Sequence, residues 1–223
     1  MDLSPSRVIR GLKNLYRREV LRDGPLLEAR RFFRENGEAR RLDYPLGPES
    51  VVVDLGGYRG DFAWAINSRY GSVVHAFEPM PKFAAEAQAR FAGNDKVHIH
   101  CFGLGAENGA FALSDDGPAS SFVDLGKASR HQVCEMRAVN QTLDALGIDH
   151  IDLLKVNIEG GEYDVMPALI AGGLFPRIKH LQIQFHTVGD FEHDRDAIRI
   201  ELEKTHSERW CYRFVWESWS LKD

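Results

Sequence analysis

The stretch Val-Val-Val-Asp-Leu-Gly-Gly-Tyr-Arg-Gly-Asp-Phe, residues 51–62, decides the fold. Its three valines are typical of a buried strand, and residues 62–69 have the spacing of a helix. Between them, the glycines allow a sharp turn and let a ligand approach the main chain closely. The start of a helix also offers unpaired N–H groups. A strand, a glycine-rich turn and a helix in this order predict the ligand-binding edge of a doubly wound α/β sheet.

Strands and helices continue to alternate after this unit, which predicts βαβ units and a parallel sheet. We expect strands at residues 73–77, 97–102, 151–158, 180–185 and 212–216. We expect helices at residues 82–91, 162–171 and 194–204. The middle of the chain breaks the pattern, because residues 110–113 and 133–139 have the character of strands without a helix between them. We interpret this part as an insertion that decorates the sheet, and its polar loop, residues 115–130, as a candidate lid.

The composition of all 223 residues is that of one globular domain, with 43% hydrophobic and 27% charged residues arguing against disorder. A net charge of −5 argues against a nucleic-acid partner, since such proteins usually carry a basic surplus. The three cysteines lie far apart without a CxxC pair, which argues against a disulfide framework or a zinc ribbon. No segment has the character of a signal peptide or a transmembrane helix, so we expect a cytoplasmic protein.

The first 46 residues differ from the rest and predict an N-terminal helical extension. Ser4 and Pro5 form a helix-start signal, and the helix that follows is basic and amphipathic. This helix is expected to cover the sheet or to form a homodimer contact, and a membrane or acidic partner is the alternative. Gly47-Pro48 predicts a turn that ends this extension, so we place the ligand-binding domain at residues 47–223.

Two motifs predict a cofactor site at the first two strands. The spacing Asp-x-Gly-x-x-x-Gly, from Asp54 through Gly56 to Gly60, is typical of proteins that bind a nucleoside joined to methionine. It matches neither the GxGxxG of dinucleotide sites nor a Walker A loop. Glu78 ends the second strand and precedes Pro79. A carboxylate at this place accepts hydrogen bonds from both hydroxyls of a ribose.

Two further motifs place polar groups at other strand ends. In residues 152–162 an apolar strand ends in Asn157 and Glu159, next to two glycines. Ligands of open α/β sheets bind outside the carboxyl ends of the strands, so both side chains are expected at the crevice. Gln182, Gln184 and His186 alternate along a later strand. A histidine at this position is a candidate general base.

Taken together, these segments resemble the FkbM family of methyltransferases. The resemblance covers about residues 50–186 and rests on VVVDLGGYRGDF (51–62), HAFEPMP (75–81), GLGAENGAFAL (103–113), SSF (120–122), TLDALGIDHIDLLKVNIEGGEYDVM (142–166) and LQIQFH (181–186). It implies a seven-strand Rossmann-like methyltransferase fold with an antiparallel last strand, S-adenosylmethionine as the cofactor, and methyl transfer to a sugar or polyketide hydroxyl.

The resemblance also implies roles for individual residues. Asp54, Gly56 and Gly60 would border the methionine end of the cofactor, and Gly57 and Asn157 are further candidate cofactor-binding residues. Glu78 would hold the ribose, with Pro79 beside it, and Phe102 and Gly103 would border the adenine. The tail from Trp210 to Trp219 resembles those of members that act on polysaccharides, which favours a sugar or glycan acceptor.

One departure from the family affects the catalytic assignment. The typical strand ends Lys-Ile-Asp-Val-Glu-Gly, and here Asn157 stands in place of the Asp. An amide is neither a base nor a strong ligand for hard metals. We therefore expect Glu159 or His186 to take the acceptor proton and Asn157 to orient the hydroxyl or the cofactor. A divalent metal held by Asn157, Glu159 and His186 is an alternative that the spacing does not demand.

Two other classes of protein share parts of this pattern. An NAD-dependent sugar-modifying oxidoreductase would use the same strand, turn and acidic residue, but the chain lacks GxGxxG, and no Lys stands four positions after Tyr163. A non-catalytic nucleoside-binding module would use its basic helix to dock on a partner. Titration with both cofactors separates the first alternative from a methyltransferase, and activity on a panel of acceptors separates the second.

Overall fold

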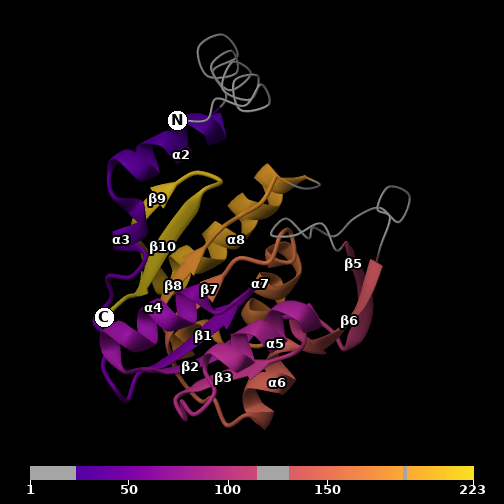
Figure 1. The fold of residues 1–223 in the computed structure, drawn as a ribbon. Coiled ribbons are helices and arrows are strands. Elements are labelled where there is room, and N and C mark those ends of the chain that lie inside the picture. The colour runs from indigo at the N-terminus through magenta and orange to yellow at the C-terminus, as the bar shows by residue number, and fades with distance from the viewer. Residues whose placement is uncertain (1–23, 115–130, 188–189) are drawn as a thin grey trace, which may run out of the picture.

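A computed structural model describes residues 24–114, 131–187 and 190–223. Figure 1 shows a central sheet with helices on both faces and a second, smaller sheet at one side. The expected lid at residues 115–130 and the basic helix near the N-terminus, with its dimer contact, lie outside the described residues. No helix among the described ranges combines the length and apolar character needed to cross a bilayer.

The central sheet has seven strands in the order β3-β2-β1-β7-β8-β10-β9. Five neighbouring strands are parallel: β3 (Val97–His100), β2 (Val73–Phe77), β1 (Val51–Leu55), β7 (Ile151–Val156) and β8 (Ile178–Ile183). β10 (Trp216–Leu221) is antiparallel to β8 and to β9 (His206–Tyr212). The predicted doubly wound sheet with an antiparallel last strand is therefore confirmed. The strand order reverses between β1 and β7, where such sheets bind ligands.

Apolar side chains on both faces of the sheet hold the helices in place. On one face, Val52 and Val74 pack with Ala63 and Ile66 of α4 (Asp61–Tyr70), and α5 (Pro81–Arg90) lies alongside. The other face buries one large cluster beneath α6, α7 and α8. These helices are α6 (Val139–Ala145), α7 (Glu162–Ala171) and α8 (Phe191–Thr205), with the 3₁₀ helix η1 (Phe175–Arg177) before β8. Valines and isoleucines buried on both faces are what a parallel sheet requires.

The insertion forms a sheet of its own. β4 (Gly103–Gly105) pairs in parallel with β6 (His131–Ala138), which pairs antiparallel with β5 (Gly109–Ser114). The predicted strand at residues 97–102 therefore ends at His100, and the chain crosses into the second sheet at Gly103. Helix α6 begins at Val139, the last residue of an expected strand. Figure 1 shows β5 and β6 standing away from the helices of the main sheet.

The described part of the N-terminal extension packs against the end of the sheet. It contains α2 (Gly24–Arg34) and α3 (Gly37–Arg40). Phe32 of α2 is buried and meets the ring of Tyr212 edge to face, with 5.3 Å between ring centroids. The hydroxyl of Tyr44 lies 2.9 Å from Ser218 Oγ of β10. This segment therefore shares the core of the sheet that follows it.

The predicted strand at residues 212–216 is wrong. β9 ends at Tyr212, β10 begins at Trp216, and these two residues pair across a hairpin. Phe214 lies at the turn with a φ of 57°, a left-handed conformation that costs free energy in any residue with a side chain. Tyr212 and Trp216 are both buried, so the apolar residues that suggested one strand belong to the facing ends of two.

Candidate active site

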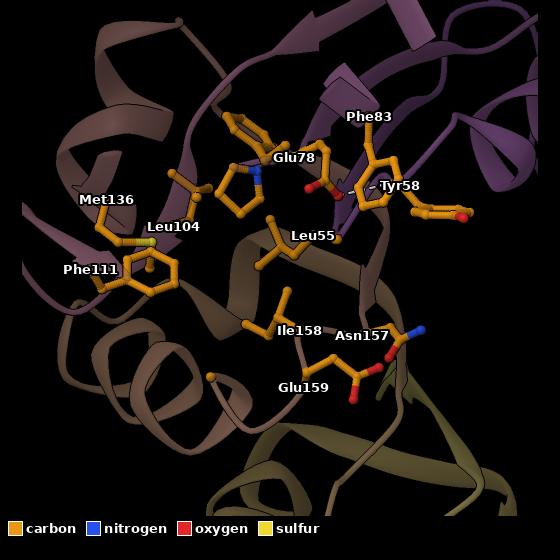
Figure 2. Close-up of a pocket in the computed structure, with 15 residues that line it drawn as sticks. Leu55, Tyr58, Glu78, Phe83, Leu104, Phe111, Met136, Asn157, Ile158 and Glu159 are labelled. Carbon is orange, nitrogen blue, oxygen red and sulfur yellow. Dashed lines mark hydrogen bonds between the residues drawn. The ribbon is translucent and has the colours of Figure 1, made fainter. Parts of the chain in front are cut away.

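A cavity of about 220 Å³ lies at the carboxyl ends of β1, β2 and β7. Figure 2 shows Leu104, Phe111 and Met136 at one end of it, Glu78 beside Tyr58 at another, and Asn157 and Glu159 along a third side. The cavity is lined by Leu55, Gly56, Tyr58, Phe77, Glu78, Pro79, Phe83, Gly103, Leu104, Phe111, Met136, Asn157, Ile158, Glu159 and Gly161. Apolar groups with a few polar ones are typical of a small-molecule site.

The glycine turn holds β1 against its two neighbours. The N–H groups of Gly56 and Gly57 both donate to the carbonyl of Phe77, each at 3.0 Å. Gly56 has a φ of 83°, and a Cβ there would lie 1.9 Å from the backbone oxygen of Asn157. Only glycine fits both the conformation and the space. The turn thus brings the ends of β1 and β7 together beside the cavity.

Glu78 is fixed by two backbone hydrogen bonds. Its Oε2 accepts from the N–H of Tyr58 at 2.8 Å, and its Oε1 accepts from the N–H of Met80 at 2.9 Å. Burial raises the pKa of this carboxyl, and the two N–H groups oppose that shift. A carboxylate has about four acceptor sites. Glu78 therefore keeps acceptor capacity for a ligand while its position is set by the main chain.

The end of β7 presents Asn157 and Glu159 to the cavity. Asn157 Oδ1 is buried and has no hydrogen-bond partner among the residues that the structure describes. Glu159 has a φ of 52°, and Tyr58, at the facing strand end, has a φ of 48°. Left-handed backbone at residues with a side chain is strained and clusters at functional sites. The two strained residues and the unpaired amide oxygen therefore lie on the same cavity, at the ends of β1 and β7.

His186 lies between two carboxylates at the end of β8. Its Nε2 is 3.3 Å from Glu159 Oε2, and its Nδ1 is 3.0 Å from Glu162 Oε1. Burial lowers the pKa of His186, but hydrogen bonds to Glu159 and Glu162 outweigh burial and raise it to about 9. The ring is an imidazolium at neutral pH, because both nitrogens face carboxylate oxygens.

Glu162 holds His186 in place, and no role was predicted for it from the sequence. Its side chain is fully buried at the start of α7. It accepts hydrogen bonds from the backbone N–H of His186 at 2.6 Å and from that of Gly160 at 2.9 Å. The signal that could have found it is its spacing, three residues after Glu159 in a glycine turn, since buried carboxylates need partners.

The remaining expected site residues lie in different places. Pro79 and Gly103 line the cavity, whereas Phe102 and Gly60 are not among its lining residues. Asp54 is fully buried, with its Oδ1 2.7 Å from Lys155 Nζ. Burial raises the pKa of Asp54 and lowers that of Lys155, and the ion pair opposes both shifts. Asp54 therefore pairs with the lysine that donates hydrogen bonds to the carbonyls of Leu55 and Gly56 in the turn.

The chain has both family and fold similarity to known proteins. It is 24% identical over 188 residues to the AMB antimetabolite synthetase AmbE of Pseudomonas aeruginosa (strain PAO1), covering 65% of this chain and 9% of that protein. A candidate rRNA methylase from Clostridium thermocellum has a TM-score of 0.50 at 11% identity, over 81% of this chain and 90% of that one. A candidate methyltransferase from Streptococcus mutans, solved in complex with S-adenosylhomocysteine (SAH), has a TM-score of 0.46 at 10% identity. The match covers 79% of this chain and 91% of that one.

The similarity to the Clostridium structure shows the shared fold alone. The curated relative is much longer, and this chain corresponds to a small part of it. The Methyltransferase FkbM domain, in contrast, matches residues 54–217, from the glycine turn into β10. That match takes in the strand ends that form the cavity, and on its strength the chain belongs to the FkbM methyltransferase family.

Proposed function

We propose that this protein transfers a methyl group from S-adenosylmethionine to a hydroxyl of a sugar or glycan intermediate. The observation that carries the proposal is the convergence of Glu78 and Asn157 on one cavity. Glu78 keeps acceptor sites for the two ribose hydroxyls, and the apolar end with Phe111 and Met136 suits a flat base. The unpaired Oδ1 of Asn157 suits a donor on the ligand.

When bound, the cofactor supplies a methyl carbon whose bond to sulfur breaks with its electron pair passing to sulfur. The acceptor oxygen forms the new bond to carbon as its proton leaves. We propose that the carboxylate of Glu159 accepts that proton. Glu159 lines the cavity and is held by His186. A protonated His186 cannot be the base at neutral pH, so it acts as the group that positions Glu159. Asn157 lies beside Glu159 and orients the hydroxyl or the cofactor.

A metal is not part of this proposal. The alternative metal set of Asn157, Glu159 and His186 stays a prediction, with His186 Nε2 and Glu159 Oε2 lying 3.3 Å apart. The sugar class of the acceptor rests on the family resemblance. The tail from Trp210 to Trp219 adds to that resemblance, but Trp216 and Trp219 are buried in the core. A polyketide-type hydroxyl is the alternative acceptor.

Calorimetric titration with S-adenosylhomocysteine tests the cofactor assignment. The wild type should bind, and Glu78→Ala should weaken binding by roughly tenfold to a hundredfold, as expected for hydrogen bonds to a charged group. The matched control is Glu86→Ala, an exposed carboxylate on α5 that pairs with Arg59. A folded wild type that binds NAD instead, or binds neither, would overturn the proposal. Activity on a panel of sugar and polyketide hydroxyls then identifies the acceptor.

A further inference from the structure

A second cavity, of about 410 Å³, adjoins the glycine turn. It shares Gly56, Tyr58 and Asn157 with the first cavity, so the two adjoin at the ends of β1 and β7. Its other walls come from α4, from Lys155 and from the segment around α3, before the first strand. The first cavity offers a place for a base and a ribose. The second offers the adjoining space for whatever the nucleoside carries.

Two cations border this second cavity, and only one is fully engaged. Lys155 Nζ lies 2.7 Å from Asp54 Oδ1 and donates to the carbonyls of Leu55 at 3.2 Å and Gly56 at 2.7 Å. One ion pair and two hydrogen bonds hold the Lys155 ammonium at the turn. Lys155, which is buried, is therefore engaged chiefly by the protein itself.

Arg41 is held rigidly but keeps donors to spare. Its Nε donates to Gln182 Oε1 at 3.1 Å, while Gln182 Nε2 donates back to the carbonyl of Arg41 at 2.9 Å. Its Nη1 donates to Glu38 Oε2 at 3.0 Å, and the guanidinium carbon lies 3.7 Å from the centre of the Trp216 ring. Within the described parts of the chain, Nη2 has no hydrogen-bond partner.

The placement of Arg41 suits an anionic ligand group. Its side chain is only 14% exposed yet lines the cavity. Burying a cation is costly unless its donors are satisfied, and a planar guanidinium fixed at one edge presents its remaining N–H groups in a set direction. Carboxylates are the natural partners of such a fork. Glu38, which also lines the cavity, supplies a negative charge for a neighbouring ammonium.

We propose that Arg41 binds the carboxylate at the amino-acid end of the cofactor. The inference rests on the proposed function, because it takes S-adenosylmethionine as the ligand of the first cavity. It assigns cofactor recognition to a residue outside the segment that matches the family, which begins at Asp54. The described part of the N-terminal extension then completes the site as well as covering the sheet.

The test compares ligands with and without the amino-acid end. We expect Arg41→Gln to weaken S-adenosylhomocysteine by roughly tenfold to a hundredfold and to leave 5′-methylthioadenosine, which lacks that end, unchanged. The matched control is Arg69→Gln, which removes an exposed ion pair between α4 and Asp43 and should change neither affinity. Equal weakening of both ligands, or no change for S-adenosylhomocysteine, would overturn the role of Arg41.

A second comparison uses the unmodified protein and guards against a variant that does not fold. The wild type should bind S-adenosylmethionine at least roughly tenfold more tightly than its decarboxylated form, because only the former offers the carboxylate. Equal affinities would overturn the inference. Arg41→Lys, which keeps the charge without the planar fork, should reduce that preference. A wild type that binds none of these nucleosides would instead overturn the proposed function.

Discussion

The end of the cavity proposed to bind the nucleoside (the nucleoside end) and the end proposed to hold the base (the catalytic end) are built by different means. At the nucleoside end, the turn that carries Gly56 and the two N–H groups that hold Glu78 are main-chain features, and the walls are apolar. At the catalytic end, His186 is fixed between Glu159 and Glu162 by charged hydrogen bonds. The nucleoside end holds one carboxylate fixed by main-chain N–H groups, whereas the catalytic end holds an imidazolium between two carboxylates. We therefore expect the two ends to respond to different perturbations, and four experiments test this.

The largest effect is expected from Glu159→Gln. Removing a general base typically costs 10²–10⁴ in rate, so turnover should fall by about that factor while S-adenosylhomocysteine binds as in the wild type. Initial rates and calorimetry on the same preparation make the measurement. Glu192→Gln, an exposed carboxylate on α8, is the control. Full turnover in Glu159→Gln would show that the cluster does not contain the base.

Gly56→Ala, at the nucleoside end, should lower the free energy of unfolding by more than about 3 kcal/mol. The new methyl group would meet the Asn157 carbonyl, and the backbone at this residue is left-handed. Gly93→Ala separates these causes. Gly93 has a φ of 85° with open space around it. Gly93→Ala should therefore lower the free energy of unfolding by only roughly 1–2 kcal/mol, the cost of placing a residue with a side chain in a left-handed conformation. Urea unfolding measures both. Equal losses would mean that the close approach of β1 and β7 adds nothing.

The charge cluster should make stability depend on pH. The pKa of His186 is raised to about 9 in the folded protein, so its contribution is complete below the unfolded value near 6.5 and is lost as the pH rises through 9. The free energy of unfolding should therefore fall by at most about 3 kcal/mol over this range, relative to His186→Gln. The exposed His193 gives a matched variant, His193→Gln, that should behave like the wild type. Parallel pH curves for His186→Gln and the wild type would contradict the imidazolium.

The smallest effect is expected at the apolar wall. Met136→Ala should weaken S-adenosylhomocysteine by roughly fivefold to tenfold, since it removes about 1 kcal/mol of contact with the base. Turnover at saturating cofactor should stay near that of the wild type, unlike that of Glu159→Gln. A loss of turnover with unchanged affinity would mean that the two ends are not separate in function.

Local patterns predicted the parts of the fold that depend on neighbours in sequence. The strand at residues 73–77 and the helix at residues 162–171 coincide with β2 and α7, because hydrophobic periodicity and glycine boundaries mark both. The hairpin of β9 and β10 was missed because its turn at Phe214 carries no glycine or asparagine. Hydrophobic residues on both sides of an unmarked turn are indistinguishable from one strand.

Cavity-lining residues that follow strands were predicted, whereas a cavity-lining residue that is held by a contact far along the chain was missed. Glu78, Asn157 and Glu159 follow strands, so the rule of carboxyl ends placed them at the cavity. Arg41 was not found because its partner Gln182 lies 141 positions away, and no local pattern records that contact. The charge of Lys155 within an apolar strand was a visible signal, since a buried ammonium needs a partner such as Asp54.

The position of β10 has a consequence for how the chain matures. β10 is synthesised after both of its neighbours, yet it lies between them, β8 and β9, in the sheet. Until it emerges, β8 has an open edge and β9 has nothing to pair with. An unpaired edge strand is a template for wrong pairing. Between the synthesis of β8 and that of β10, the growing chain therefore exposes a strand edge, and the pairing of β10 with both neighbours closes that edge.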